Sequence, residues 1–272
     1  MVSTGTHSDG VPVVAYQVRR AGGEVLAERD ADAPFYAAST VKLAVLVAAA
    51  RALEDGALTV EQEVASTDTF RSQVPGAPDY RIEPDDLDPG MPAPGTLVPV
   101  GQVVDRMIVV SSNEATNIVI ELVGLDAANR ALADAGATRS VVGRKYSDLA
   151  AEARGDSHRT TAGDLAALMS AVVTGRLAGP EQTAWMLGLL ARQTERQLTA
   201  AVPDGVPCGS KSGWVDGIRH DVAFVGEPGP GALVVAVCTR GYDEAQAEET
   251  LKALGALAVT LAGPTPPTSP RP

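Results

Sequence analysis

Cysteine and histidine are scarce in this sequence. Its 272 residues include only two cysteines, Cys208 and Cys238, which are too few for the disulfide framework of a small secreted protein. Both fall in expected strands, and we predict free thiols rather than a single bridge. The only histidines are His7, His158 and His220, and no H-E-x-x-H motif is present. Glycine-rich nucleotide motifs are missing as well, so we expect no metal and no other cofactor.

Basic residues and long apolar runs are also lacking. Lys and Arg total 22 against 34 Asp and Glu, and the formal net charge of −12 disfavours nucleic acid as a partner. No apolar run reaches the roughly 18 residues that span a bilayer. The first ten residues lack the basic and apolar regions of an export signal, so we expect a cytoplasmic protein, or a secreted one if the sequence given has been trimmed.

The elements that we do expect form β structure at both ends of the chain and helices between them. A hairpin is predicted over residues 11–20 and 24–28, around a glycine turn. Proline, aspartate and glycine accumulate at 66–95 and predict a long surface loop. Helices are predicted at 39–53, 98–110, 113–123, 126–135, 161–174, 179–193 and 242–262, and further strands at 207–213, 221–225 and 232–240.

This order means that one sheet is assembled from both ends of the chain around a helical insertion, which is an α+β architecture. We predict a single domain over residues 1–263. Its α/β lobe would comprise about 1–60 and 205–263, and its helical lobe about 61–204. Five prolines in residues 264–272 exclude a continued helix, and we expect a disordered tail there.

Ser39 and Lys42 are the first candidates for chemistry. They lie three residues apart at the start of a predicted helix, so both side chains project from one face, where a hydroxyl and an amine can meet. The free amides at a helix start can also donate to a developing oxyanion, and the amide of Ser39 is one of them. The alternative is an N-capping serine followed by a surface lysine.

Two further motifs follow in the chain. The first is Ser111-Ser112-Asn113, which could instead be an N-cap run before the next helix. The second is Lys211-Ser212-Gly213, which could instead be an edge-strand turn. In this order the three motifs resemble the S-x-x-K, S-D-N and K-T-G signature of class A β-lactamases and penicillin-binding proteins, over residues 11–262.

The resemblance implies a β-lactamase/transpeptidase-like fold, with an antiparallel sheet flanked by helices and an all-helical lobe. It implies that Ser39 is acylated, that Ser111 relays a proton to the leaving group, and that Asn113 holds the substrate amide and Lys42. The implied substrate-binding residues are Lys211, Ser212, Gly213 and Trp214, the last through its amide as second oxyanion donor. An amine is a base only when neutral, and burial with Lys211 nearby would lower the pKa of Lys42.

Arg219 and His220 stand on the turn into the next predicted strand. They are secondary candidates for binding a substrate carboxylate at the cleft. The alternative, which the sequence favours equally, is that Arg219 forms a salt bridge at the end of the strand.

The sequence departs from the family pattern in three places. Ser112 replaces the Asp of the second motif, and Ser212 replaces the Thr of the third but keeps the hydroxyl. The Glu-x-x-Leu-Asn run that carries the deacylating glutamate has no clear counterpart. Asp148 is a candidate for orienting water, as is Glu152, against the alternative of solvated loop carboxylates. The deacylation base therefore stays open.

We accordingly predict a serine β-lactamase-like hydrolase that forms an acyl-enzyme on Ser39 with a β-lactam or a similar carboxylate-bearing amide. One alternative is an esterase, amidase or peptidase of the same fold. Another is a penicillin-binding or sensing module that deacylates slowly. The expected partner is a small-molecule substrate, and we expect a monomer.

Overall fold

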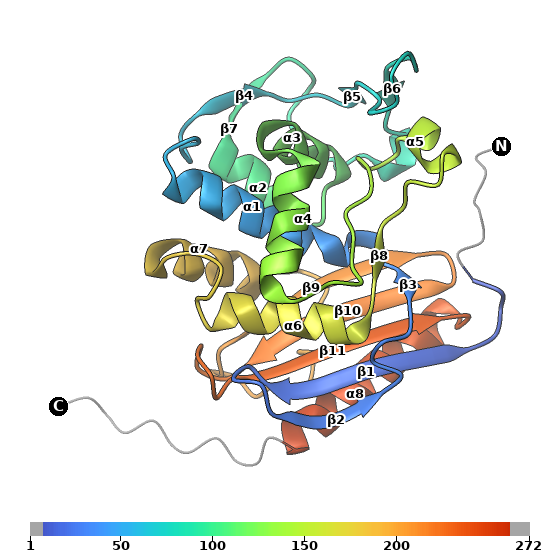
Figure 1. Cartoon of the computed structure of the whole chain (residues 1–272), viewed down its shortest axis with the longest axis vertical. Coiled ribbons are helices and arrows are strands. Elements are labelled where there is room, and N and C mark those ends of the chain that lie inside the picture. The colour runs from blue at the N-terminus through green and yellow to red at the C-terminus, as the bar shows by residue number, and fades with distance from the viewer. Residues whose placement is uncertain (1–7, 262–272) are drawn as a thin grey trace.

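The sheet at the centre of the fold is built from both ends of the chain. The computed structural model describes residues 8–261, and within them five strands form one antiparallel sheet in the order β2-β1-β11-β10-β9 (Figure 1). The strands are β1 (Val13–Arg20), β2 (Val25–Arg29), β9 (Cys208–Val215), β10 (Ile218–Val225) and β11 (Leu233–Arg240). The predicted assembly from the two ends is thus confirmed, and β9 lies at an edge.

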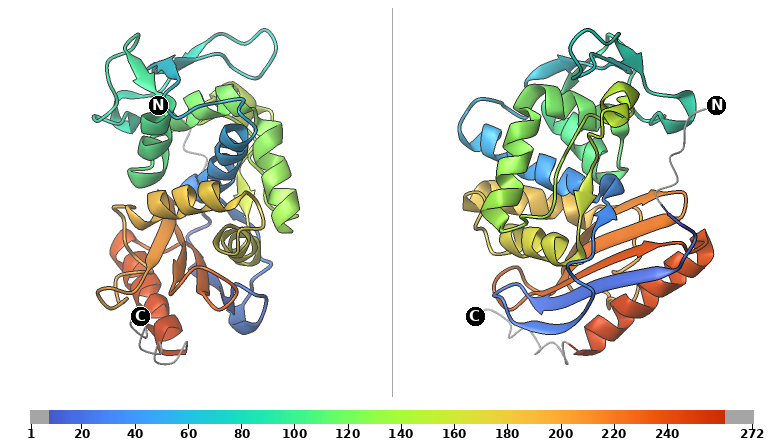
Figure 2. Two further views of the ribbon diagram at one scale, coloured as in Figure 1. Left: turned by 90° about the vertical axis from the view of Figure 1, so that its left-hand side faces the viewer. Right: turned by 45° about the vertical axis from the view of Figure 1, so that its right-hand side comes forward.

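Helices cover both faces of this sheet (Figure 2). On one face lies α8 (Glu244–Leu261), whose buried residues are Ala247, Leu251, Gly255 and Ala258. Their spacing places them on one side of the helix, against apolar side chains of β1, β10 and β11. On the other face lies α6 (Ala162–Val173), which contacts β1, β10 and β11.

The helical lobe packs around α1 (Lys42–Glu54). Residues 42–50 of α1 are all buried, and apart from Lys42 they are Ala, Val and Leu. A helix that is apolar on every side belongs in a core, which is why the lysine at its first turn is buried as well. The helices that contact α1 are α2 (Val100–Val109), α3 (Asn113–Val123), α4 (Leu125–Ala135), α6 and α7 (Pro180–Ala191).

Several element boundaries differ from the predictions. The helix predicted from residue 39 is preceded by a 3₁₀ helix, Ala38–Val41. β10 begins at Ile218 rather than 221, because Gly217 makes a tight turn with φ 72° that lets Ile218 pair with Val215. Unpredicted elements are α5 (Leu149–Ala153), the 3₁₀ helix Pro84–Asp86, and three pairs of short strands, β3 (Phe35–Tyr36) with β8 (Arg159–Thr160), β4 (Glu63–Ala65) with β7 (Leu97–Pro99), and β5 (Thr69–Phe70) with β6 (Tyr80–Arg81).

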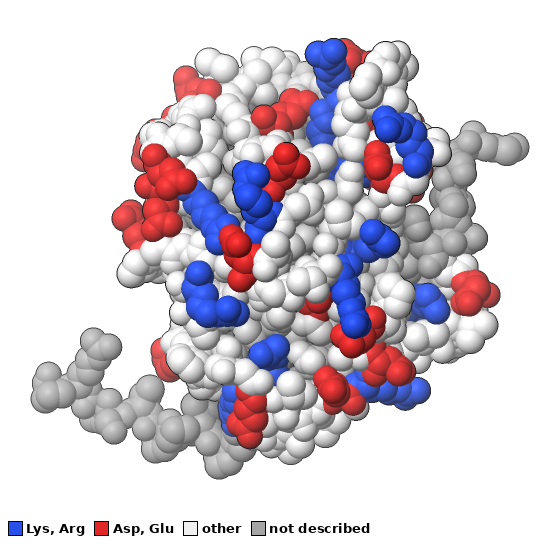
Figure 3. Space-filling model, in the orientation of Figure 1, with Lys and Arg blue, Asp and Glu red and all other residues white. Residues whose placement is uncertain are grey.

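Other sequence predictions can be compared directly with the fold. Cys208 and Cys238 are free thiols, as expected. None of the helices in residues 8–261 is long and apolar enough to cross a membrane. On the face drawn in Figure 3, basic side chains lie beside acidic ones over both lobes. The predictions for His7 and the tail 264–272 lie outside the described residues, and the lobe boundaries stay a prediction.

Candidate active site

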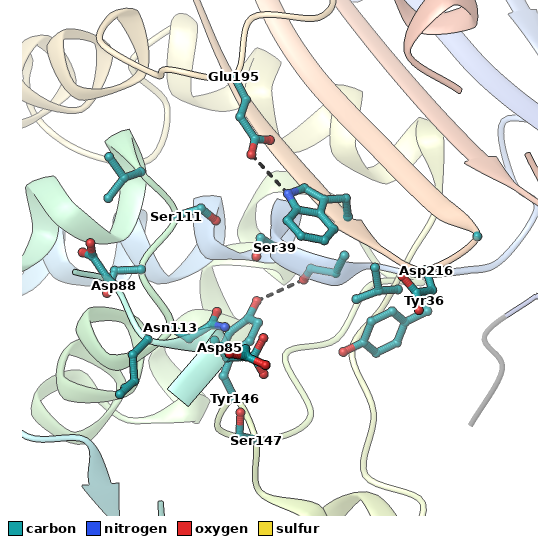
Figure 4. Close-up of a pocket in the computed structure, with 18 of the residues that line it drawn as sticks. Tyr36, Ser39, Asp85, Asp88, Ser111, Asn113, Tyr146, Ser147, Glu195 and Asp216 are labelled. Carbon is teal, nitrogen blue, oxygen red and sulfur yellow. Dashed lines mark hydrogen bonds between the residues drawn. The ribbon is translucent and has the colours of Figure 1, made fainter. Parts of the chain in front are cut away.

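Ser39 lies at the wall of a large cavity. It belongs to the 3₁₀ helix that precedes α1, and this short helix contacts β9 and β10. The cavity has a volume of about 1010 Å³ and is lined by residues of the sheet edge and of the helical lobe (Figure 4). Ala38, directly before Ser39, has φ 48°, a conformation that non-glycine residues rarely adopt and that concentrates at functional sites.

Lys42 is fully buried beneath Ser39. Its Nζ donates to Ser111 O at 2.6 Å, to Asn113 Oδ1 at 2.8 Å and to Ser111 Oγ at 3.3 Å. It also lies 4.4 Å from the ring centre of Tyr146. Burial lowers the pKa of Lys42 well below its usual value, and the positive charge of Lys211 lowers it further. The amine is thus closer to the neutral form that a base requires.

Within the described residues, no hydrogen bond joins Ser39 to Lys42. The Ser39 side chain interacts instead with the phenol of Tyr146, which also donates to Ala38 O at 3.0 Å. Burial raises the pKa of Tyr146 well above its usual value, and the positive charge of Arg144 and the hydrogen bond with Ser39 oppose this only in part. The phenol is therefore a neutral donor beside the nucleophile.

The turn between α2 and α3 brings Ser111 and Asn113 to the cavity. Ser112 is the N-cap of α3 and accepts from Ala115 N at 3.2 Å, so the capping alternative applies to Ser112 alone. Ser111 has φ 61° and its Oγ accepts from Lys42 Nζ at 3.3 Å and from Lys211 Nζ at 3.0 Å. Because this oxygen already accepts two bonds from amines, its own proton is free to point into the cavity.

Strand β9 brings Lys211 and Gly213 to the same place. Lys211 is fully buried, and its Nζ also donates to Ser212 O at 2.7 Å. Burial lowers the pKa of Lys211 to about 8, while the carboxylates of Glu195 and Asp221 oppose this shift. A Cβ added at Gly213 would lie 2.7 Å from the amide nitrogens of Ser39 and Thr40, so only glycine permits this approach.

Trp214 follows Gly213 on the same strand, lines the cavity and is about half exposed. Because β9 is an edge strand, the amides on its outer side have no neighbouring strand to bond. Strand β9 contacts the 3₁₀ helix that carries Ser39, so the amide of Trp214 stays the predicted second oxyanion donor.

Arg219 and His220 have partners outside the cavity. The guanidinium of Arg219 pairs with Glu248 at 2.9 Å and with Glu244, both on α8, which is the salt-bridge alternative. His220 is fully buried; its Nδ1 accepts from Thr239 N at 3.1 Å and its Nε2 donates to Tyr36 O at 2.9 Å. Neither is among the described residues that line the cavity, although the Arg219 guanidinium lies 5.8 Å from the ring centre of Trp214, which does line it. A role of either residue in binding a substrate carboxylate stays a prediction.

Asp148 is also placed differently from the sequence expectation. It is the N-cap of α5, is fully buried, and accepts from Ser72 Oγ at 2.9 Å, Gln73 N at 2.9 Å and Ala151 N at 3.1 Å. It is not among the described residues that line the cavity, so the predicted role of Asp148 in orienting water gains no support from its position. Glu152 does line the cavity, where it pairs with Arg144 at 3.1 Å.

Sequence reasoning missed two residues of the site, Tyr146 and Glu195. Asn117 fixes Tyr146 by accepting from its amide at 2.7 Å and donating to its carbonyl at 2.9 Å. His158, one of the three histidines of the sequence, is fully buried and stacks on Tyr146 with 4.7 Å between the ring centres. A tyrosine between charged residues in a chain with 4% aromatics was a weak signal for Tyr146. Glu195 lies in an irregular loop, and no pattern in the sequence pointed to it.

A serine at a helix start, a buried lysine one turn on, and a second serine held between two lysines define a serine hydrolase of the β-lactamase type. The chain belongs to the β-lactamase enzyme family, whose family model matches residues 6–261. Among curated proteins, no sequence matches this chain.

Solved structures agree with this assignment. A β-lactamase from Sphaerobacter thermophilus DSM 20745 is 29% identical, with a TM-score of 0.77 over 94% of this chain and 93% of that one. A β-lactamase from Xanthomonas campestris pv. campestris str. ATCC 33913 is 20% identical, with a TM-score of 0.75 over 94% and 93%. A mutant of PBP-A is 21% identical, with a TM-score of 0.74 over 92% and 89%. The predicted fold class is thereby confirmed.

Proposed function

We propose that this serine hydrolase forms an acyl-enzyme through Ser39 on a β-lactam or a related small amide or ester. The observation that supports this most directly is the buried amine of Lys42, whose pKa is lowered by burial and by Lys211, one helical turn from Ser39. The PBP-A neighbour is described as an acyl-enzyme complex with penicillin G, which supports the same chemistry for this fold.

In the first step, Ser39 Oγ attacks the carbonyl carbon of the substrate. Its proton passes to the neutral amine of Lys42, after rotation of the hydroxyl away from Tyr146. The carbonyl π electrons move to the oxygen, and the amides of Ser39 and Trp214 bind the resulting oxyanion. Asn113 holds Lys42 and offers its amide group to the substrate.

In the second step, the tetrahedral intermediate collapses. The C–N bond breaks, and the leaving nitrogen takes the hydroxyl proton of Ser111. Ser111 is reprotonated by the ammonium of Lys42, so the base returns to its neutral form and all protons balance. Lys211 keeps the Ser111 oxygen oriented through the hydrogen bond of 3.0 Å. Water then hydrolyses the ester on Ser39 and restores the free enzyme.

We further propose that this hydrolysis is slow. Tyr146 places a neutral phenol, rather than a carboxylate, beside Ser39. Asp148 is held in its capping role by three hydrogen bonds. Glu152 is paired with Arg144. A water molecule near the acyl ester therefore lacks a dedicated base, and the acyl-enzyme should accumulate.

Intact-mass spectrometry during incubation with penicillin G tests the proposal. We expect the protein to gain the full mass of penicillin G, because ring opening releases no fragment, and to lose it slowly. Ser39→Ala should form no adduct. The matched control is Ser8→Ala, which removes a different hydroxyl from the wall of the same cavity and should be acylated normally. An adduct on Ser39→Ala, or no adduct on the wild type with penicillin G or with a simple phenyl ester, would contradict the proposal.

A further inference from the structure

The loop between α7 and β9 positions one carboxylate, that of Glu195, inside the cavity. Gln193 Nε2 donates to Ile108 O at 3.0 Å and Thr194 N donates to Val109 O at 3.1 Å, so the loop is fastened to the end of α2. Gln193 Oε1 accepts from the amide of Glu195 at 3.1 Å. These bonds hold Glu195 between the Ser111 turn and strand β9.

The Glu195 carboxylate is bound by two donors of β9. Its Oε2 accepts from Ser212 Oγ at 2.8 Å. Its Oε1 accepts from Trp214 Nε1 at 3.1 Å, which is the bond drawn from Glu195 in Figure 4. The positive charge of Lys211 is close enough for Glu195 to oppose the lowering of its pKa. A hydroxyl, an indole N–H and a nearby ammonium thus form a carboxylate site, and this chain's own side chain fills it.

The other charged residues of the described cavity wall do not form a second binding site for a substrate carboxylate. Among the described lining residues the only cations are Arg106, which pairs with Asp88, and Arg144, which pairs with Glu152. The other charged lining residues are acidic: Asp85, Asp86, Asp216 and Asp243. A substrate carboxylate would have to displace Glu195 and would meet a negative field, whereas an amine would be attracted.

We propose that Glu195 is a specificity-determining residue that occupies the carboxylate position beside Ser212 and directs this site toward acyl compounds carrying a neutral or cationic group there. This inference rests on the proposed acylation of Ser39. Each Glu195 oxygen accepts one bond in the structure, and a carboxylate has about four acceptor positions, so it can accept further bonds from a substrate N–H or ammonium.

The test uses two substrates that differ only at the carboxylate, penicillin G and its methyl ester. Second-order rate constants for acylation are measured by intact mass at pH 6.5, where Lys211 is largely protonated, for the wild type, Glu195→Gln and Glu195→Ala. The matched control is Asp216→Asn, which removes one negative charge from the same cavity wall without touching Ser212. We expect both Glu195 variants to acylate with penicillin G on the order of tenfold faster, since that factor is about the strength of one charge-assisted hydrogen bond.

The methyl ester should change by less than about twofold in these variants. Asp216→Asn removes only one of several acidic groups from the wall, so it should speed acylation by penicillin G much less than the Glu195 variants do. The wild type itself should prefer the methyl ester, which keeps the proposal testable if a Glu195 variant fails to fold. Equal or slower penicillin G acylation in both Glu195 variants, or a wild type that prefers the free acid, would overturn the role of Glu195 while leaving acylation of Ser39 intact. No adduct with either substrate in any variant would overturn both proposals.

Discussion

The buried ammonium of Lys211 should make the unfolding free energy depend measurably on pH. Its pKa is about 8 in the folded protein, against 10.5 as the ordinary value. Below pH 8 both states bind the proton, and the folded state is penalised by about 3 kcal/mol, because each pKa unit corresponds to about 1.4 kcal/mol. Between the two pKa values the unfolded chain binds one more proton, so stability rises with pH. We expect this group alone to raise the unfolding free energy by about 2 kcal/mol as the pH rises from 7 to 9.5.

Lys211→Met removes this contribution. At pH 7 the variant avoids the penalty of about 3 kcal/mol but loses two hydrogen bonds, to Ser111 Oγ and Ser212 O, worth about 1 kcal/mol each. It should therefore be about 1 kcal/mol more stable than the wild type at pH 7 and about 1 kcal/mol less stable at pH 9.5. The acylation of Ser39 should be strongly reduced at both pH values.

Urea denaturation at half-unit steps from pH 7 to 9.5 measures the difference between the two proteins. Taking this difference cancels the titration of the shared groups that do not interact with Lys211. Lys252→Met, on the exposed face of α8, is the control for the loss of one positive charge. A difference that stays constant with pH, or that moves in favour of the variant as pH rises, would refute the reasoning.

Two further predictions concern backbone approach and capping. Gly213→Ala should slow acylation by about 100-fold, because its Cβ would lie 2.7 Å from two amides of the Ser39 helix and force β9 away. Gly188→Ala on α7, where nothing lies within 4 Å, should leave the rate unchanged, and equal rates in both variants would contradict the prediction. Asp148→Asn should lower the unfolding free energy by about 1–3 kcal/mol in urea denaturation, since it disturbs three buried hydrogen bonds. Intact mass should show the acyl-enzyme of this variant decaying at the same rate as that of the wild type. A tenfold slower decay would instead mean that Asp148 orients the hydrolytic water.

The sequence was most informative where the geometry is local. Ser39 and Lys42 share one helical turn, and the apolar composition of 41–50 indicated that the turn would be buried. The other two motifs were located by their order and by family resemblance, since their contacts with Lys42 cross 69 and 169 positions of the chain. The hydrogen bonds from Lys42 and Lys211 to Ser111 place all three motifs together.

The structure places several residues in positions that no sequence pattern indicated, and the reasons are physical. Arg219 and His220 lie on a strand, and the sequence does not indicate which face of a sheet a strand residue points to, or that α8 carries the partners of Arg219. Asp148 caps a one-turn helix too short to leave a periodic signal. Glu195 is placed by bonds from Gln193 and Thr194 to the end of α2, 85 residues earlier.

The charges of the site are coupled. Because of this coupling, Glu195 can restrict which substrates bind and still support the base that Ser39 needs. Glu195 raises the proton affinity of Lys211, which therefore stays protonated near neutral pH. The charge of Lys211 in turn lowers the pKa of Lys42, which favours the neutral amine that Ser39 needs. Removing Glu195 would thus open the carboxylate site but would also weaken the charge on Lys211. The gain in acylation by penicillin G should accordingly shrink in the Glu195 variants as pH rises past 8, faster than in Asp216→Asn.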